Sequence, residues 1–171
     1  MKKENVYCNA SDLALYISDK YKSDYGREIS GIKLQKSLYF LFAYWGAFVR
    51  KSNRDNSVEE KITLPEYLFK DEIEAWTYGP VIPNVYRNIE AIKEFSDESE
   101  FEKIRQKLSQ NESIFAFIND LLKDIFEISD FKLVDMSHQD KCWKDNYVET
   151  DERHDRTIDK ESIINEYFSK I

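Results

Sequence analysis

Apolar side chains recur along most of the chain at the three- and four-residue spacings of amphipathic helices. The longest such run lies within residues 34–49 and consists of Leu34, Leu38, Leu41, Phe42, Trp45, Phe48 and Val49. This spacing keeps one face of a helix apolar over four turns. Tyr39, Phe40 and Tyr44 widen that face. The sequence therefore predicts a central helix buried on most sides, with Ser30 as a candidate N-cap.

Shorter runs with the same spacing predict further helices. One lies before Gly26 with Asn9 or Ser11 as its cap, one covers residues 114–128, and one follows the candidate cap Asp159. Three more are expected. The first is a helix opened by Pro83 with Val81 or Val85, Ile89 and Ile92 on one face. The others are a solvated helix starting in residues 97–102 and a helix capped by Asp130 with Leu133, Val134 and Met136. These elements predict a mainly α fold.

The segments between these helices are polar or interrupted by proline. Residues 50–61 are almost wholly polar and predict an exposed loop. Pro65 restricts residues 62–74 to an edge strand or an extended segment. We therefore expect a compact single-domain helical bundle over residues 1–171, built around the buried central helix, with at most a small β-hairpin or edge strand.

Composition narrows the classes of function. The 171 residues include only four glycines and three prolines, which favours helices over Gly-rich nucleotide-binding folds. Twenty-five basic and 33 acidic residues give a net charge of −8, so a general nucleic-acid binder is disfavoured. Neither a bilayer-spanning apolar stretch nor an apolar leader after Met1 is present, and Cys8 and Cys142 are far apart. The sequence predicts a cytoplasmic protein with free thiols and no membrane contact.

Candidate chemistry is sparse. His138 and Cys142, four residues apart, would share a helix face and could form half of a zinc site or a nucleophile–base pair, but no matching second pair follows. A hydrogen-bonded histidine and a buried thiol are the favoured interpretation. The run Asp151, Glu152, His154 and Asp155 could serve a metal-dependent hydrolase, although solvated surface is favoured there too. We expect no catalytic residue, no cofactor and no metal.

Two local motifs are more informative. Lys33 and Lys36 lie three apart on the flank of the central helix, and periodicity alone predicts that they are solubilising surface charges. Trp76 precedes Tyr78-Gly79-Pro80, an arrangement typical of a core anchor packed under a turn. Gly79 would let the backbone bend and Pro80 would fix the direction of the next helix.

These segments, in this order, resemble the Panacea domain family, also described as SocA-like or phage-associated GepA-type proteins. The matching elements are Lys33-Leu34-Gln35-Lys36 with Leu38-Tyr39-Phe40, Glu74-Ala75-Trp76, Gly79-Pro80-Val81, Pro83 with Val85-Tyr86, Ser137-His138 before Trp143, and residues 163–168. Two positions depart from the family pattern. Ser137 replaces the usual Thr, and Cys142 replaces the usual Pro, which leaves the backbone shape around Trp143 open.

The resemblance implies a non-catalytic antitoxin, in some cases prophage-encoded, that neutralises a small toxin encoded nearby by direct protein–protein binding. The partner-binding or family-motif residues that it implies are Lys33, Gln35, Lys36, Trp76, Gly79, Pro80, His138 and Trp143. Three alternatives stay open. The chain could be a phage-encoded acidic inhibitor of a host nucleic-acid-binding or defence protein, a protease adaptor that delivers a toxin for degradation, or an enzyme using His138.

Overall fold

The computed structural model describes residues 5–55, 64–149 and 156–171. These residues form nine helices and one two-stranded antiparallel sheet, which confirms the mainly α fold with a small hairpin. In chain order the elements are α1 (Ala10–Tyr25), α2 (Gly31–Asp55), β1 (Glu74–Trp76), β2 (Gly79–Val81), α3 (Pro83–Arg87), α4 (Ile89–Glu94), α5 (Glu98–Leu108), α6 (Glu112–Phe126), α7 (Asp130–His138), α8 (Lys141–Lys144) and α9 (Lys160–Phe168).

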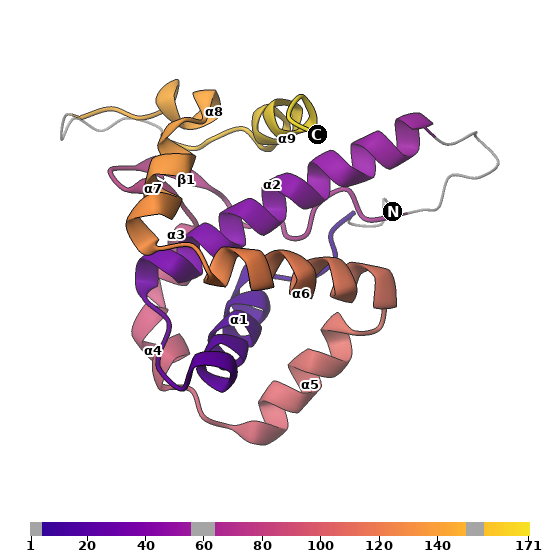
Figure 1. Cartoon of the computed structure of the whole chain (residues 1–171), viewed down its shortest axis with the longest axis vertical. Helices are drawn as coiled ribbons and strands as arrows, with labels where there is room; N and C mark the ends of the chain where they lie inside the picture. Colours follow the sequence, from indigo (N-terminus) through magenta and orange to yellow (C-terminus); the bar gives the residue numbers. More distant parts are fainter. Residues whose placement is uncertain (1–4, 56–63, 150–155) are drawn as a thin grey trace.

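Helix α2 is the centre of the fold. In Figure 1 it runs obliquely through the molecule, with α9 on one side and α1 and α6 on the other, and it also contacts α7. Its predicted apolar face is buried, with Phe48 as the exception at 46% exposure. Phe48 instead stacks on Phe117 at the surface, with ring centroids 5.9 Å apart. The prediction of a central buried helix is confirmed, except that Phe48 is exposed and stacks on the partly buried Phe117 of α6.

The loop expected over residues 50–61 is wrong for its first half, because α2 continues to Asp55. Arg50 explains the continuation: its guanidinium hydrogen-bonds Asn165 and pairs with Glu161, both on α9. The rest of that expected loop lies outside the described residues. Close packing of α2 and α9 occurs at Gly46, where an added Cβ would overlap the side chain of Ile164.

The predicted helix starts are mostly correct. Asn9, Asp97 and Asp159 cap α1, α5 and α9 with their side-chain oxygens, and the Ser30 hydroxyl accepts from Lys33 N at 3.0 Å. Helix α7 is capped by Ser129 rather than by Asp130. Asp130 occupies the first helical position instead, where a negative charge also favours the helix.

The helix expected after Pro83 is divided at Asn88 into α3 and α4. Pro83 is the first residue of α3, as predicted. The Asn88 side-chain amide donates to Asn84 O at 2.7 Å, a local bond that competes with the helical hydrogen-bond ladder. The chain therefore bends at Asn88, which turns Tyr86 and Ile89 toward the hairpin.

A buried polar cluster ties α2, α8 and α9 together. Asp140, the N-cap of α8, is fully buried, and its Oδ2 accepts hydrogen bonds from the hydroxyls of Tyr39 at 2.5 Å and Tyr167 at 2.6 Å. Its Oδ1 accepts from Lys170 Nζ at 2.7 Å. We call these four residues the Asp140 cluster. It joins positions more than 100 residues apart in the sequence, so it holds the C-terminal helix against the centre of the fold.

The segment before the hairpin is extended, as predicted. Tyr67 forms a parallel bridge with Val6, and Cys8 N donates to Leu68 O at 2.9 Å. Within the described ranges, no helix combines the length and apolar character needed to cross a membrane.

Candidate functional site

The β1–β2 hairpin is the element around which most of the predicted site residues gather. Its register pairs Glu74 with Val81, Ala75 with Pro80 and Trp76 with Gly79, so Thr77 and Tyr78 form the turn. Gly79 has φ 109°, a backbone conformation that L side chains rarely adopt. On the other edge of β1, Ala75 N donates to Arg156 O at 2.8 Å, and Ile158 N donates to Ile73 O at 2.7 Å. The hairpin is therefore braced by a segment from near the C-terminus.

Two residues of α2 form hydrogen bonds to the backbone of the hairpin and of the residue that follows it. Lys36 Nζ donates to Pro80 O at 3.0 Å, and the Gln35 side chain makes two hydrogen bonds to the backbone of Ile82. Lys36 is only 1% exposed, so its interpretation as a solubilising surface charge is wrong. It was misplaced because helical spacing does not reveal that the hairpin lies across this flank of α2.

Lys33 is also buried, but it belongs to a different part of the fold. Its Nζ donates to Phe126 O at 3.1 Å, lies 3.7 Å from Asp130 Oδ1 and sits above the ring of Tyr21. The surface interpretation is wrong for Lys33 too. Its contacts join α2 to α6 and α7, so the structure does not bring it together with the hairpin residues.

Helices α7 and α8 hold the turn of the hairpin from the side. His138 Nε2 lies 3.0 Å from Thr77 O, and the Trp143 indole N–H donates to Trp76 O at 2.8 Å. The two rings stack with centroids 4.2 Å apart, and Tyr147 stacks on the other face of Trp143. The structure thus brings together seven of the eight predicted residues: Gln35, Lys36, Trp76, Gly79, Pro80, His138 and Trp143.

Cys142 does not share a helix face with His138, as the sequence spacing had suggested. The helix breaks between them, and the Cys142 sulfur lies 3.5 Å from the Tyr39 hydroxyl in the core. Burial raises the pKa of the Cys142 thiol to about 12, so it stays protonated at neutral pH. Cys142 N donates to Glu166, a bond that the proline usual in the family could not make, and Trp143 keeps an ordered place.

No group of three or more His, Cys, Asp or Glu side chains in the described part of the chain is arranged to hold a metal ion. The acidic run with Asp151, Glu152, His154 and Asp155 lies outside the described residues.

Trp76 is partly exposed, so the expectation of a core anchor is only partly met. Its ring meets Tyr86 edge to face with centroids 4.8 Å apart. Both rings line a pocket of about 560 Å³ between the hairpin, α3–α4 and the start of α2, which we call the hairpin pocket. Tyr78 and Tyr86, two of its lining residues, are 59% and 53% exposed.

The rest of the hairpin pocket is partly apolar and partly charged. Ile32, Val81 and Ile89 contribute aliphatic surface, and the charged lining residues are Lys36, Glu90, Lys93 and Arg156. Sequence reasoning missed Tyr86, Lys93 and Arg156 as site residues. No spacing could have found them as a set, because the pocket collects side chains from separate segments.

Lys36 forms no ion pair with any residue in the described ranges. Among the described residues its hydrogen-bond acceptor is a backbone carbonyl, and burial lowers its pKa to about 7. The unfolded chain holds the same proton up to about pH 10.5. Above pH 7 the folded state therefore binds fewer protons at this site, and the free energy of unfolding should rise with pH.

Lys36→Met should remove this rise. From about pH 7 to about pH 8.5, the unfolding free energy of the wild type should gain up to about 1.4 kcal/mol per pH unit from Lys36. Above pH 9.0 the buried thiols act in the opposite direction, because Cys8 and Cys142 keep their protons in the folded state. Urea titrations across the lower range measure the slope, with the exposed Lys103→Met as the matched control. Equal slopes for the wild type and Lys36→Met would contradict the assignment.

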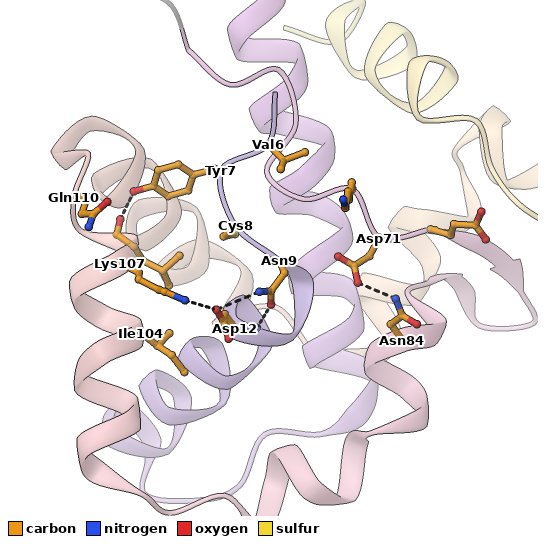
Figure 2. A pocket seen from close by; sticks show the side chains of 13 residues that line it. Val6, Tyr7, Cys8, Asn9, Asp12, Asp71, Asn84, Ile104, Lys107 and Gln110 are labelled. Atoms are coloured by element: carbon orange, nitrogen blue, oxygen red, sulfur yellow. Dashed lines mark hydrogen bonds and ion pairs between the residues drawn. The ribbon is translucent and has the colours of Figure 1, made fainter. Parts of the chain in front are cut away.

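A second pocket, of about 830 Å³, lies between the N-terminal segment, α1 and α5 (Figure 2). Two of its carboxylates already serve the fold. Asp71 accepts hydrogen bonds from Ala10 N and from the Asn84 side chain, while Asp12 pairs with Lys107. Burial raises the pKa of the Cys8 thiol to about 12, which makes it a poor nucleophile. The hairpin pocket, whose basic residues form no salt bridge within the described part of the chain, is therefore the stronger candidate site.

Comparison with known proteins supports the same region. Residues 60–144 match the family described as antitoxin SocA-like, Panacea domain, which confirms the resemblance. The match includes the hairpin, His138 and Trp143. It begins after α2 and therefore does not include Lys33, Gln35 and Lys36. No curated protein and no solved structure matches the chain significantly.

Proposed function

Because residues 60–144 belong to the antitoxin SocA-like Panacea family, we propose that this chain neutralises a toxin protein by binding it directly, without catalysis, through the surface around the hairpin pocket. The observation that carries the proposal is the position of the exposed Tyr78 and Tyr86 side chains at the hairpin, which hydrogen bonds from α2, α7 and α8 hold in place. Aromatic residues in such positions contribute a large share of the energy of protein interfaces.

The geometry around the hairpin suits a binding surface. Gln35 and Lys36 fix the hairpin from α2, while His138 and Trp143 fix its turn from α7 and α8. A surface held in this way loses little conformational freedom when a partner binds. The net charge of −8 adds a long-range attraction toward a basic toxin and would speed the encounter.

Co-expression with the neighbouring reading frame tests the proposal. We expect that frame to be toxic alone, the toxicity to disappear with this chain, and the two products to purify together. Tyr86→Ala should weaken the complex by about tenfold or more, because truncating a central interface aromatic commonly costs about 2 kcal/mol. Phe131→Ala, which removes a 70% exposed ring on α7 that does not line the pocket, is the matched control.

The mode of action can be separated in the same system. Masking consumes one antitoxin for each complex, so inhibition of the purified toxin should saturate at a fixed molar ratio. Protection far below that ratio would indicate turnover and would contradict the non-catalytic proposal. A fall in toxin level that requires a host protease would indicate delivery for degradation. A neighbouring frame that is harmless alone, or that stays lethal beside this chain, would remove the support for an antitoxin.

A further inference from the structure

We propose that the hairpin pocket receives a segment of the partner protein that presents a large apolar side chain next to a carboxylate. The identity of the partner as a protein rests on the proposed function, whereas the chemistry of the pocket stands on its own geometry. The inference names what the partner must offer.

The apolar part of the segment follows from one wall of the pocket. Trp76 and Tyr86 meet edge to face, and Val81 and Ile89 extend that surface. A volume of about 560 Å³ lies within the usual range of ligand sites, about 300–1,000 Å³. The exposed faces of these rings would be removed from water by an inserted aromatic or large aliphatic side chain.

The carboxylate follows from the charges in the pocket. Three basic residues, Lys36, Lys93 and Arg156, line it together with a single acid, Glu90, although the chain as a whole carries a charge of −8. None of the three forms a salt bridge with a described residue. This local excess of positive charge is complementary to an acidic group.

Lys36 strengthens that argument. It is 1% exposed, and its single hydrogen bond to Pro80 O uses one of the three donors of an ammonium group. A buried cation is stabilised most by a carboxylate that reaches it, since charge-assisted hydrogen bonds are stronger than neutral ones. The residues that the structure describes supply no such group at this position, which leaves it open to a carboxylate from a bound partner.

Aromatic rings beside lysine and arginine also occur in sites for single-stranded nucleic acid. Here the positive charge is confined to the pocket, Glu90 lies within it, and the rest of the chain is acidic. A strand of several phosphates would extend beyond the pocket into that repulsive field, whereas one carboxylate would not. A protein segment is therefore favoured.

The test uses the full chain and short probes. N-acetyl-Phe-Glu-Gly amide is titrated while the indole N–H signal of Trp76 is followed by NMR, with Trp76→Phe assigning the signal. We expect a dissociation constant of about 1 mM, and at least about tenfold weaker binding of the uncharged Phe-Gln-Gly analogue, because a charge-assisted bond is lost. The Ala-Glu-Gly analogue should be weaker by a similar factor, because it lacks the apolar side chain.

Charge reversal at the rim provides the matched variants. Lys93→Glu combined with Arg156→Glu should weaken the Phe-Glu-Gly probe by about tenfold or more, while Lys103→Glu on α5 should leave it unchanged. Equal affinity for the Glu and Gln probes, no shift of the Trp76 signal, or tighter binding of a six-residue oligothymidylate would overturn the inference. Each readout is independent of any toxin. If the probe binds but no toxin is captured, the proposed function is contradicted and this inference stands. If a toxin is captured but the probe does not bind, this inference is contradicted and the proposed function stands.

Discussion

Replacing Asp140 with alanine is expected to lower the free energy of unfolding by about 3–5 kcal/mol, a large part of the total stability of a domain of this size. Asp140 is fully buried and accepts hydrogen bonds from the hydroxyls of Tyr39 and Tyr167 and from the ammonium of Lys170. Alanine would leave both hydroxyls buried without their acceptor, and each such group costs about 1–3 kcal/mol. It would also free Lys170 from α8.

Chemical denaturation monitored by circular dichroism measures this effect. Asp135→Ala is the matched control, because that carboxylate on α7 is exposed and its removal should change stability by less than about 0.5 kcal/mol. Tyr167→Phe removes one hydroxyl and leaves the carboxylate two of its partners, so it should cost about 1 kcal/mol. If Asp140→Ala cost no more than Asp135→Ala, the Asp140 cluster would not be holding α9 in place.

Gly79→Ala is the second substitution with a large expected effect, about 3 kcal/mol or more. Two independent costs combine at this position. The φ of 109° is strained for any residue with a side chain, and an added Cβ would overlap Ser137 Oγ and lie 2.9 Å from Lys36 Nζ. The hairpin cannot move away easily, because Lys36 hydrogen-bonds to Pro80 within β2 and Gln35 hydrogen-bonds to Ile82, the residue after β2.

Two other glycines separate these costs. Gly26 has φ 69° and free space around its Cα, so Gly26→Ala should show only the backbone strain, about 1–2 kcal/mol. Gly31 begins α2 without a positive φ or a close neighbour, so Gly31→Ala should be neutral or slightly stabilising. Thermal unfolding of the three variants should rank Gly79 far above Gly26 and Gly26 above Gly31. A Gly79→Ala protein as stable as the Gly26→Ala protein would show that the hairpin is looser than its contacts imply.

The helices could be predicted because their signal is local. Alternation of apolar residues, together with caps such as Asn9 and Asp159, depends only on neighbours in the sequence. The break at Asn88 could not be predicted, because an asparagine in this position is compatible with either a helix or a turn. The hydrogen bond from its side chain to Asn84 O, which the sequence does not reveal, accompanies the break.

The contacts of the buried ionisable residues could not be predicted from neighbouring positions in the sequence. Lys33 and Lys36 have the spacing of surface residues, yet one meets α6 and α7 and the other meets the hairpin. The Asp140 cluster joins residues from near positions 39, 140 and 167, and no sequence spacing links them. Such contacts depend on which elements pack together, which single-sequence patterns do not encode.

Predictions for the candidate site were of mixed success for the same reason. The family motif located the hairpin and its supports, including Trp76, His138 and Trp143. Tyr86, Lys93 and Arg156 complete the pocket from outside the motif positions proposed as binding residues. The motif residues therefore account for how the hairpin is held, whereas all the charged side chains of the pocket except Lys36 come from outside the motif.

The bracing of β1 by the segment at residues 156–158 has a consequence for synthesis. Arg156 supplies both a hydrogen bond to Ala75 and part of the pocket lining, and α9 follows it directly. Synthesis must therefore pass Arg156 and Ile158 before this surface can form. A chain that ended before these residues would lack both the hydrogen bond to Ala75 and the Arg156 side chain of the pocket, so it could not present the same surface.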